Sequence, residues 1–576
     1  MKKKIKKTKQ KSFFFEDYRE SEIINEKNKK KIIISLNRTT FLFFIFFSLI
    51  FVSSTKIIYL SLSPEKKIFT QKNKKDFTIS RSDIIDRNGA ILARNIIVYR
   101  AGVRPQFIKN KEKFIINLRL KFPEIDFEEV KNKLNKNKFF YLGKKRFTEE
   151  EKDKLWSLGL GNKVLNIEEQ QYRLYPQKNL FSHVLGQTNE DNLGISGIEK
   201  YYNKKLKNKR DDNFSLEMSL DSNLQYLIRE ELVKSQKIFK TIGSAALLMN
   251  VNNGEILSLV SLPDFDLNKR LSITNHAYTN KITKGVYELG SVFKTFVLAA
   301  ALENKAIQTN TVFKNLENKI YCAGNEIKEH DKLPKNLSAE QILIRSSNIG
   351  AIRVAQKVGI EKYRNFLNSL ELFKTIDFDL HEVGKPLQFK WGKCKLATSS
   401  FGHGITTTPL QLAKAYAMIG NGGNKIRPTL LKNKKHKKKE KKEKIVSLET
   451  SYKINSALRK VVANKEGTAN FANIEGYEVG GKTGTALKSI DGVYSNKKIN
   501  TFVSLFPTSK PKYVLLVLLD EPKPAPDYVY EFPNGYKHKG EYRNTSGWNT
   551  VVVAGKIIEK IGPILAINNL QASKKF

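Results

Sequence analysis

Three short motifs rich in serine, lysine and threonine follow one another along this chain. They are Ser291–Lys294 (SVFK), Ser346–Asn348 (SSN) and Lys482–Thr485 (KTGT), and the intervals from 291 to 346 and from 346 to 482 are 55 and 136 residues. A lysine-rich chain produces Ser-x-x-Lys by chance, as it does at Ser495, but Lys-Thr-Gly occurs only once. The order and spacing predict one acylating serine enzyme, with room for a helical subdomain and a return to a sheet.

The first motif supplies a nucleophile and its base. A serine hydroxyl is a poor nucleophile and needs a base within hydrogen-bond reach. Ser291 and Lys294 are three residues apart, and on a helix this spacing places both side chains on one face. Lys294 must be neutral to accept the proton, so burial and a nearby cation, for which Lys482 is the candidate, are expected to lower its pKa. Ser346 would pass the proton to the leaving group.

The remaining groups suit an oxyanion and a carboxylate. Gly290 precedes an apolar run with helical spacing, which places Ser291 at the N-terminus of a buried helix, where its N–H suits an oxyanion. Residues 479–486 predict an edge strand whose glycines let a substrate backbone approach. The Thr485 N–H would be the second oxyanion donor. Substrate binding is expected from Thr483, Gly484 and Thr485 together with Lys482, and Asn348 would orient the substrate amide.

These motifs resemble those of the penicillin-binding proteins and serine β-lactamases. The resemblance covers roughly residues 39–570 and favours a class B penicillin-binding protein. Two departures, Leu289 for a usual proline and Ser82 for a usual glycine, concern local turns only. The segments that are similar to the family are 287–296, 401–404, 408–412 and 480–486 in the catalytic part, and 81–89, 173–176 and 194–199 in its non-catalytic pedestal.

The resemblance implies a D,D-transpeptidase without a metal or cofactor. The implied donor is a peptidoglycan stem peptide ending in D-Ala-D-Ala, and β-lactams would trap the same serine. The implied catalytic residues are Ser291, Lys294, Ser346, Asn348 and Lys482. We find no glutamate placed like the water-activating carboxylate of class A β-lactamases, so an amine acceptor is favoured over hydrolysis.

Composition limits the other classes of function. A net charge of +45 invites a nucleic-acid role, but no nucleic-acid motif accompanies it, and Lys, Asn, Ile and Phe are favoured by A/T-rich codons. A chain of 576 residues has room for two or three domains. Cys322 and Cys394 are the only cysteines, and we expect them to be free and buried rather than bridged.

The N-terminal region predicts a membrane anchor. Residues 1–38 carry 13 Lys or Arg against five Asp or Glu, and Phe41–Val52 is apolar except for Ser48. This pattern places the N-terminus in the cytoplasm. A cleaved signal peptide is the alternative, but apolar residues resume at Ile57, so residues 39–62 can span the bilayer. The expected location is the cell inner membrane, with the catalytic domain in the periplasm.

The predicted fold is multi-domain α+β. It has a basic tail at 1–38, the anchor at 39–62, an irregular pedestal or dimerisation-type domain at 63–218, and a transpeptidase domain at 219–576 with an antiparallel sheet flanked by helices. The pedestal is either a partner-binding module or purely structural. The strands are expected at 245–251, 255–260, 478–486, 500–506 and 513–520, and the helices at 338–345, 349–358 and 548–561.

Two further segments admit a simpler interpretation. The basic run Lys432–Lys444 is typical of a disordered, solvated loop, with polymer or lipid binding as the alternative. His403 lies between glycines without a second histidine at ligand spacing, so packing is favoured over metal binding.

The cellular role is a finer question. The compact pedestal, the Gly402–Gly404 stretch and the tail from Ser546 to Leu565 look more like the septal enzyme than the elongation enzyme, which is the runner-up. Either enzyme would need a polytopic glycan polymerase and other divisome membrane proteins as partners, because no glycosyltransferase domain precedes the pedestal. A non-catalytic β-lactam sensor or divisome scaffold is disfavoured, because 38 residues are too few for a cytoplasmic signalling module.

Overall fold

In the N-terminal unit, residues 1–78, the part that the structure describes is a long helix, α2, from Lys29 to Leu62. The structure is a computed structural model that describes residues 29–62, 81–143, 146–207, 214–271, 275–387, 390–392, 394–433, 443–490, 493–532 and 535–574. Within α2, the stretch Thr40–Ile58 is long and apolar enough to cross a membrane, and its side chains are exposed. The helix begins ten residues before the predicted anchor at 39–62 and ends with it at Leu62.

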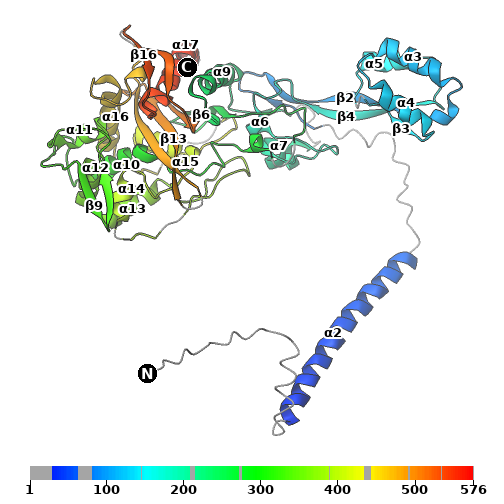
Figure 1. The fold of residues 1–576 in the computed structure, drawn as a ribbon, viewed down its shortest axis with the longest axis horizontal. Helices are drawn as coiled ribbons and strands as arrows, with labels where there is room; N and C mark the ends of the chain where they lie inside the picture. The colour runs from blue at the N-terminus through cyan, green and yellow to red at the C-terminus, as the bar shows by residue number, and fades with distance from the viewer. Residues whose placement is uncertain are drawn as a thin grey trace, which may run out of the picture. The chain divides into compact units, whose positions relative to one another are not determined.

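The second unit, residues 79–576, is built around a five-stranded antiparallel sheet. The strand order is β12-β13-β14-β6-β7, and β12 is an edge strand as predicted (Figure 1). The strand that reads as continuously apolar, β14, is the central one, so its burial on both faces is explained. The strands are β6 (Gly243–Asn250), β7 (Ile256–Leu262), β12 (Gly480–Ile490), β13 (Val493–Phe506) and β14 (Tyr513–Asp520).

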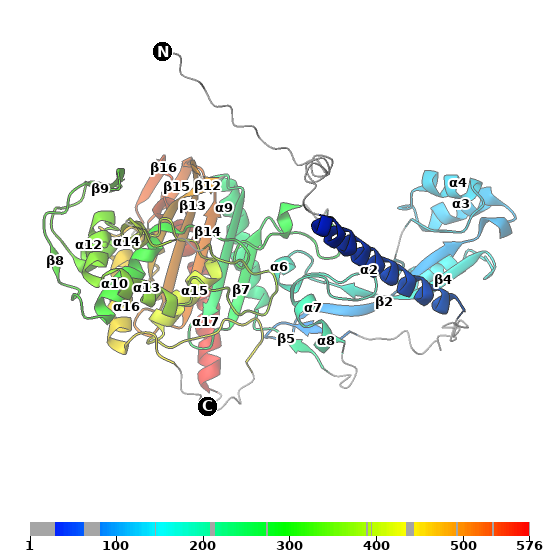
Figure 2. The same cartoon turned by 90° about the horizontal axis from the view of Figure 1, so that it is seen from below.

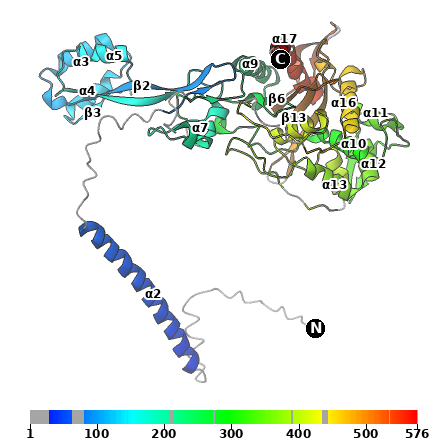
Figure 3. The same ribbon diagram turned by 180° about the vertical axis from the view of Figure 1, so that it is seen from behind.

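Helices cover both faces of this sheet (Figure 2). On one face α9 (Ser222–Phe239) packs on β6 and β7, and α17 (Thr550–Lys574) packs on β13 and β14. On the other face α15 (Pro409–Gly420) and α16 (Leu448–Ala463) pack on the strands. A helical group adjoins α16 and consists of α10 (Lys294–Glu303), α11 (Ala339–Ile344), α12 (Asn348–Val358), α13 (Ile360–Ser369) and α14 (Lys395–Ser400) (Figure 3).

Local signals in the sequence placed several of these elements correctly. The capping box of Ser338 and Gln341 begins α11, and α12 ends at Gly359. The prediction for the C-terminal helix was too short. We expected it to end at Ile561, before Gly562 and Pro563, but α17 continues to Lys574 with Pro563 inside it. Packing explains the continuation, because Leu565 beyond the proline is 3% exposed and belongs to the core.

The region from 81 to 217 is more regular than expected. Its long ribbon pairs β2 (Ile91–Val103) with β4 (Leu165–Leu174), and ends at a small lobe (Figure 1). The lobe has a hydrophobic core of its own, with Phe147 and Leu155 fully buried. The lobe helices are α3 (Lys111–Lys121), α4 (Phe127–Asn135) and α5 (Glu149–Trp156); the short elements are β1 (Ile84–Ile85), β3 (Phe140–Tyr141), α6 (Ser182–Leu185), α7 (Gly197–Tyr201), α8 (Asn203–Leu206) and β5 (Leu216–Glu217).

A buried ion-pair cluster joins the three pedestal motifs. Glu199 accepts hydrogen bonds from Arg81 Nε at 2.5 Å and from Arg173 Nε at 2.7 Å. All three side chains are at most 1% exposed. Removal of Glu199 would leave two buried guanidinium groups without a counter-charge, and an uncompensated buried charge costs about 3–5 kcal/mol in comparable sites. Segments that are far apart in the sequence thus meet at one carboxylate.

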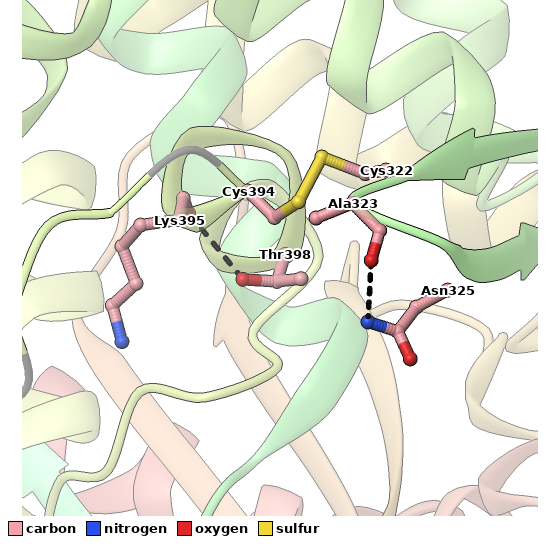
Figure 4. The surroundings of a disulfide bond; sticks show 6 residues. All are labelled: Cys322, Ala323, Asn325, Cys394, Lys395 and Thr398. Carbon is pink, nitrogen blue, oxygen red and sulfur yellow. Dashed lines mark hydrogen bonds between the residues drawn. A yellow bond between two sulfur atoms is a disulfide. The ribbon is translucent and has the colours of Figure 1, made fainter.

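The two cysteines form a disulfide, so the expectation that they are free is wrong. Cys322 and Cys394 are bonded, with Cα atoms 5.8 Å apart (Figure 4). No local pattern indicates this pairing, because 72 residues separate the two cysteines along the chain. The hairpin of β9 (Lys319–Cys322) and β10 (Asn325–Lys328) brings Cys322 next to the residue before α14. The other short strands are β8 (Val312–Phe313), β11 (Leu337–Ser338), β15 (Ala525–Glu531) and β16 (Lys537–Glu541).

The predicted solvated loop at 432–444 falls mostly on residues 434–442, which lie outside the described residues.

Candidate active site

Ser291 lies in a short 3-10 turn rather than in an α-helix. The turn comprises Gly290–Phe293, and α10 begins at Lys294. Side chains three residues apart lie on one side of a 3-10 turn, so the turn keeps Ser291 and Lys294 on the same side of the chain, as an α-helix would. Tyr416 of α15 fixes the turn, because its hydroxyl donates to the Val292 carbonyl at 2.7 Å.

The Lys294 amine is buried and holds the second motif. It donates to the Ser346 carbonyl at 2.5 Å, to Asn348 Oδ1 at 2.7 Å and to Ser346 Oγ at 3.2 Å. The Ser291 side chain is only partly buried. The predicted nucleophile is therefore partly accessible to solvent, whereas the predicted base is enclosed by the SSN motif.

Ser346 occupies a backbone position that usually belongs to glycine. Its φ is +60°, and it follows the last turn of α11. Its N–H donates to the Leu343 carbonyl at 3.2 Å, and the Ser347 N–H donates to the Ile342 carbonyl at 3.0 Å. These two bonds form a Schellman motif, in which glycine is the common residue at the left-handed position. A serine there accepts the backbone strain and places its hydroxyl in the site.

Lys482 reaches the same hydroxyl from the sheet. Its amine donates to Ser346 Oγ at 2.8 Å, and Lys482 is 0% exposed. Thr483 Oγ1 lies 2.9 Å from Thr468 Oγ1, and the Ser546 N–H donates to Thr485 Oγ1 at 3.1 Å. The hydroxyl of Ser346 thus lies between two buried amines, one from α10 and one from β12.

The glycines of β12 leave room for backbone atoms of neighbouring segments of the same protein. A Cβ on Gly484 would lie 2.2 Å from the Leu289 carbonyl oxygen, and one on Gly481 would lie 2.6 Å from the Val503 carbonyl oxygen. These close contacts give the glycines a role in packing within the protein, and the expected approach of a substrate backbone stays a prediction. A Cβ on Gly290, whose φ is +65°, would lie 2.6 Å from the Thr485 carbonyl oxygen. The Ser291 turn and Thr485, the two predicted oxyanion donors, are therefore packed together.

Burial changes the protonation of both lysines. It lowers the pKa of the Lys294 amine to about 7, and the carboxylate of Glu329 opposes this shift. Burial also holds the pKa of Lys482 well below its usual range, and repulsion from Lys294 lowers it further. Two adjacent buried amines cannot both stay charged. We therefore assign burial, rather than a cationic Lys482, as the main cause of the lowered Lys294 pKa.

Sequence reasoning missed three residues that support the site. Glu329 accepts from the backbone N–H of Asn348 at 2.8 Å, Thr468 contacts Thr483, and the Ser546 hydroxyl donates to the Gly484 carbonyl. No local pattern marks any of them as functional. The tail that contains Ser546 resembles the septal enzyme, but this resemblance does not point to its hydroxyl.

His403 packs against an aromatic ring. Its ring stacks on Tyr494 with centroids 4.5 Å apart, and its Nδ1 lies 3.5 Å from the Glu288 carboxylate. The Tyr494 hydroxyl donates to the same carboxylate at 3.0 Å. These contacts fit the predicted packing role and place the Gly402–Gly404 loop beside the turn that carries Ser291.

Two family models match the chain. The penicillin binding protein transpeptidase domain matches residues 244–536, and the penicillin-binding protein dimerisation domain matches residues 78–216. The first match contains all three motifs.

Several relatives match most of the chain. The probable peptidoglycan D,D-transpeptidase FtsI of Caulobacter vibrioides is 30% identical over 85% of this chain and 82% of its own length. The peptidoglycan D,D-transpeptidase FtsI of Escherichia coli K12 is 28% identical over 78% of this chain and 80% of its own. The stage V sporulation protein D of Bacillus subtilis is 30% identical over 78% and 75%.

Among solved structures, penicillin-binding protein 3 from Mycobacterium tuberculosis, complexed with aztreonam, shares the fold. Its TM-score is 0.63 at 19% identity, and the match covers 85% of this chain and 96% of that one.

Proposed function

The chain belongs to the penicillin-binding protein transpeptidase family, and from this premise we propose that it is a class B, septal peptidoglycan D,D-transpeptidase. The substrate is a stem peptide ending in D-Ala-D-Ala, and β-lactams are substrate-like inhibitors. The observation that carries the proposal is the position of the Ser346 hydroxyl between the buried amines of Lys294 and Lys482.

This geometry provides a route for the acylation proton. Lys294, with a pKa of about 7, takes the proton of the Ser291 hydroxyl while Ser291 Oγ bonds to the penultimate D-Ala carbonyl carbon. The C–N bond to the terminal D-Ala breaks, and its nitrogen receives a proton through Ser346. The amine of a second stem peptide then attacks the ester carbonyl carbon. The new C–N bond forms the cross-link, the C–O bond to Ser291 breaks, and the proton that the amine loses returns through Lys294 to Ser291 Oγ.

The remaining site groups bind charge. The N–H groups of Ser291 and Thr485 stabilise the oxyanion, since preorganised donors are worth about 3–4 kcal/mol in acyl transfer. Thr483 and Thr485 present hydroxyls, together with the backbone of Gly484, for the terminal carboxylate. Asn348 orients the substrate amide. Its Oδ1 accepts from Lys294 and its Nδ2 donates to the Lys328 carbonyl at 2.9 Å, so one amide hydrogen and one lone pair of Oδ1 are left for substrate.

Labelling with a fluorescent penicillin tests the nucleophile. Ser291→Ala should abolish labelling of the full-length protein, whereas wild type should label in proportion to active enzyme. Ser495→Ala is the matched control, because Ser495 begins a chance Ser-x-x-Lys and its hydroxyl donates to the Lys488 carbonyl at 3.0 Å. Equal labelling of Ser291→Ala and wild type would refute the assignment.

Depletion in cells tests the septal role. We expect filaments, because septal cross-linking would stop while elongation continues. Rounded cells would instead assign the enzyme to elongation, the second candidate.

The anchor and domain boundaries complete the proposal. The protein is membrane-anchored. We place the tail 1–38 in the cytoplasm, the anchor 39–62 in the inner membrane, and the pedestal 63–218 and catalytic domain 219–576 in the periplasm. A polytopic glycan polymerase and other divisome membrane proteins are the expected partners, and nucleic acid is not. A reporter enzyme that is active only in the periplasm, fused after residue 218, should be active; an inactive fusion would contradict this orientation.

A further inference from the structure

Glu329 makes three contacts with the start of α12. Its Oε1 accepts from the Ser347 hydroxyl at 2.6 Å and from the Ile349 N–H at 2.9 Å. Its Oε2 accepts from the Asn348 N–H at 2.8 Å. The first N–H groups of a helix have no partner within the helix, and a carboxylate satisfies them and complements the helix dipole. One side chain therefore fixes the turn that carries the SSN motif.

The residue before Glu329 fixes the amide of Asn348. The Lys328 carbonyl accepts from Asn348 Nδ2 at 2.9 Å, which leaves Oδ1 to accept from Lys294 at 2.7 Å. The amide cannot rotate without losing both bonds. The β9–β10 hairpin thus decides which atom of Asn348 faces the base.

The hairpin itself is tied down at both ends. At its base the Glu329 N–H donates to the Asn318 carbonyl at 2.9 Å. At its tip Cys322 is bonded to Cys394, next to the start of α14 (Figure 4). Most hairpin side chains are exposed or only partly buried, so little apolar packing holds it. Ile320 and Ile327 pack partly against the core, and the disulfide adds a covalent tie to this limited packing.

We propose that Glu329 is a positioning residue for acyl transfer, which fixes the first turn of α12 so that Ser346 and Asn348 present their oxygens to Lys294. The proposal rests on the proposed function and adds a residue to it. Glu329 does not touch the nucleophile, so its effect passes through the SSN motif and the base.

The charge of Glu329 gives the proposal a specific signature. The charged and titratable groups that act on one another here are Lys294, Lys482, Glu329, His330, Asp331 and Lys498. Burial lowers the pKa of His330, and Lys294 lowers it further. The Glu329 carboxylate raises the pKa of Lys294, against burial. Loss of this charge lowers that pKa, so the amine becomes neutral, and competent as a base, at lower pH. The acid limb of the acylation profile should then move to lower pH.

The test compares Glu329→Gln with Glu329→Ala in the full-length protein. Acylation by a fluorescent penicillin is measured from pH 5 to 9, a window of about two units on either side of the Lys294 pKa of about 7. We expect Glu329→Ala to lower the plateau rate by about tenfold to a hundredfold, because a displacement of about 1 Å can have this effect. Glu329→Gln keeps an acceptor, so it should recover most of the plateau and show the shifted acid limb.

Glu326→Gln is the matched control. Glu326 lies on the same hairpin, is exposed and pairs with Lys319 and Tyr321. Its variant should keep the wild-type plateau and acid limb. The proposal is overturned if both Glu329 variants acylate like wild type, or if the acid limb of Glu329→Gln does not move. If Glu329→Ala fails to fold, Glu329→Gln alone decides. Failure of the proposed function would instead appear as labelling of Ser291→Ala.

Discussion

The two walls of the active site are held in different ways. On the strand wall, Lys482 and the two threonines come from β12, whose register with β13 is fixed by a continuous ladder from Gly480 to Leu487. On the helix wall, Ser346 and Asn348 depend on a Schellman turn, on Glu329 and on a hairpin held by a disulfide. The strand wall is therefore sensitive to anything that intrudes on the backbone, and the helix wall to the loss of single contacts.

Lys294 bonds to the helix wall and shares the Ser346 hydroxyl with the strand wall, so its removal should have the largest effect. Lys294→Ala removes the base, and general bases typically contribute about 10²–10⁴-fold in rate. Stopped-flow acylation by a chromogenic β-lactam measures the loss. Lys357→Ala, an exposed lysine on α12, is the control. A Lys294→Ala rate close to wild type would show that another group takes the proton.

Breaking the disulfide should weaken the helix wall alone. Cys322→Ser/Cys394→Ser should lower the free energy of unfolding by about 2–4 kcal/mol, as is typical of native disulfides, and should reduce acylation. Dithiothreitol should reproduce the effect in wild type and change nothing further in the double variant. If wild type and the double variant unfold at the same temperature, the disulfide does not contribute to the stability of the hairpin.

A side chain added to a glycine of β12 should disturb the packing of the strand wall. In Gly484→Ala the new Cβ would meet the Leu289 carbonyl oxygen at 2.2 Å. Overpacking of this kind costs about 1–3 kcal/mol, so thermal unfolding should occur at lower temperature and acylation should slow. Gly161→Ala, with nothing within 4 Å of the new Cβ, is the control. Equal stability of both variants would contradict the close packing of β12 against the Ser291 turn.

The smallest difference in stability is expected between two substitutions at the left-handed turn of the helix wall. Ser346→Gly and Ser346→Ala both remove the hydroxyl and should lose acylation alike. Only glycine relieves the positive φ, so Ser346→Gly should be more stable than Ser346→Ala by about 1 kcal/mol. Denaturant unfolding measures the difference. An alanine variant as stable as the glycine variant would show that this backbone is not strained.

Features that depend on residues close together in the sequence were predictable. Each of them lies within one turn, one strand or one membrane span, so its pattern is visible locally. These features are the three motifs, the hairpin through Asn252–Gly254, the capping box at Ser338 and the apolar anchor. The order of the motifs was enough to predict that they meet.

Only the tertiary structure decided how the motifs meet. The pairing of Cys322 with Cys394, the contact of Glu329 with α12 and the approach of Leu289 to Gly484 join residues that are far apart in the chain. The lowered pKa of Lys294 also depends on tertiary structure, because burial by several elements causes it. A lysine three residues after a serine is written in the sequence, but the removal of water that makes its amine a base arises only when the helix wall and the strand wall close around it.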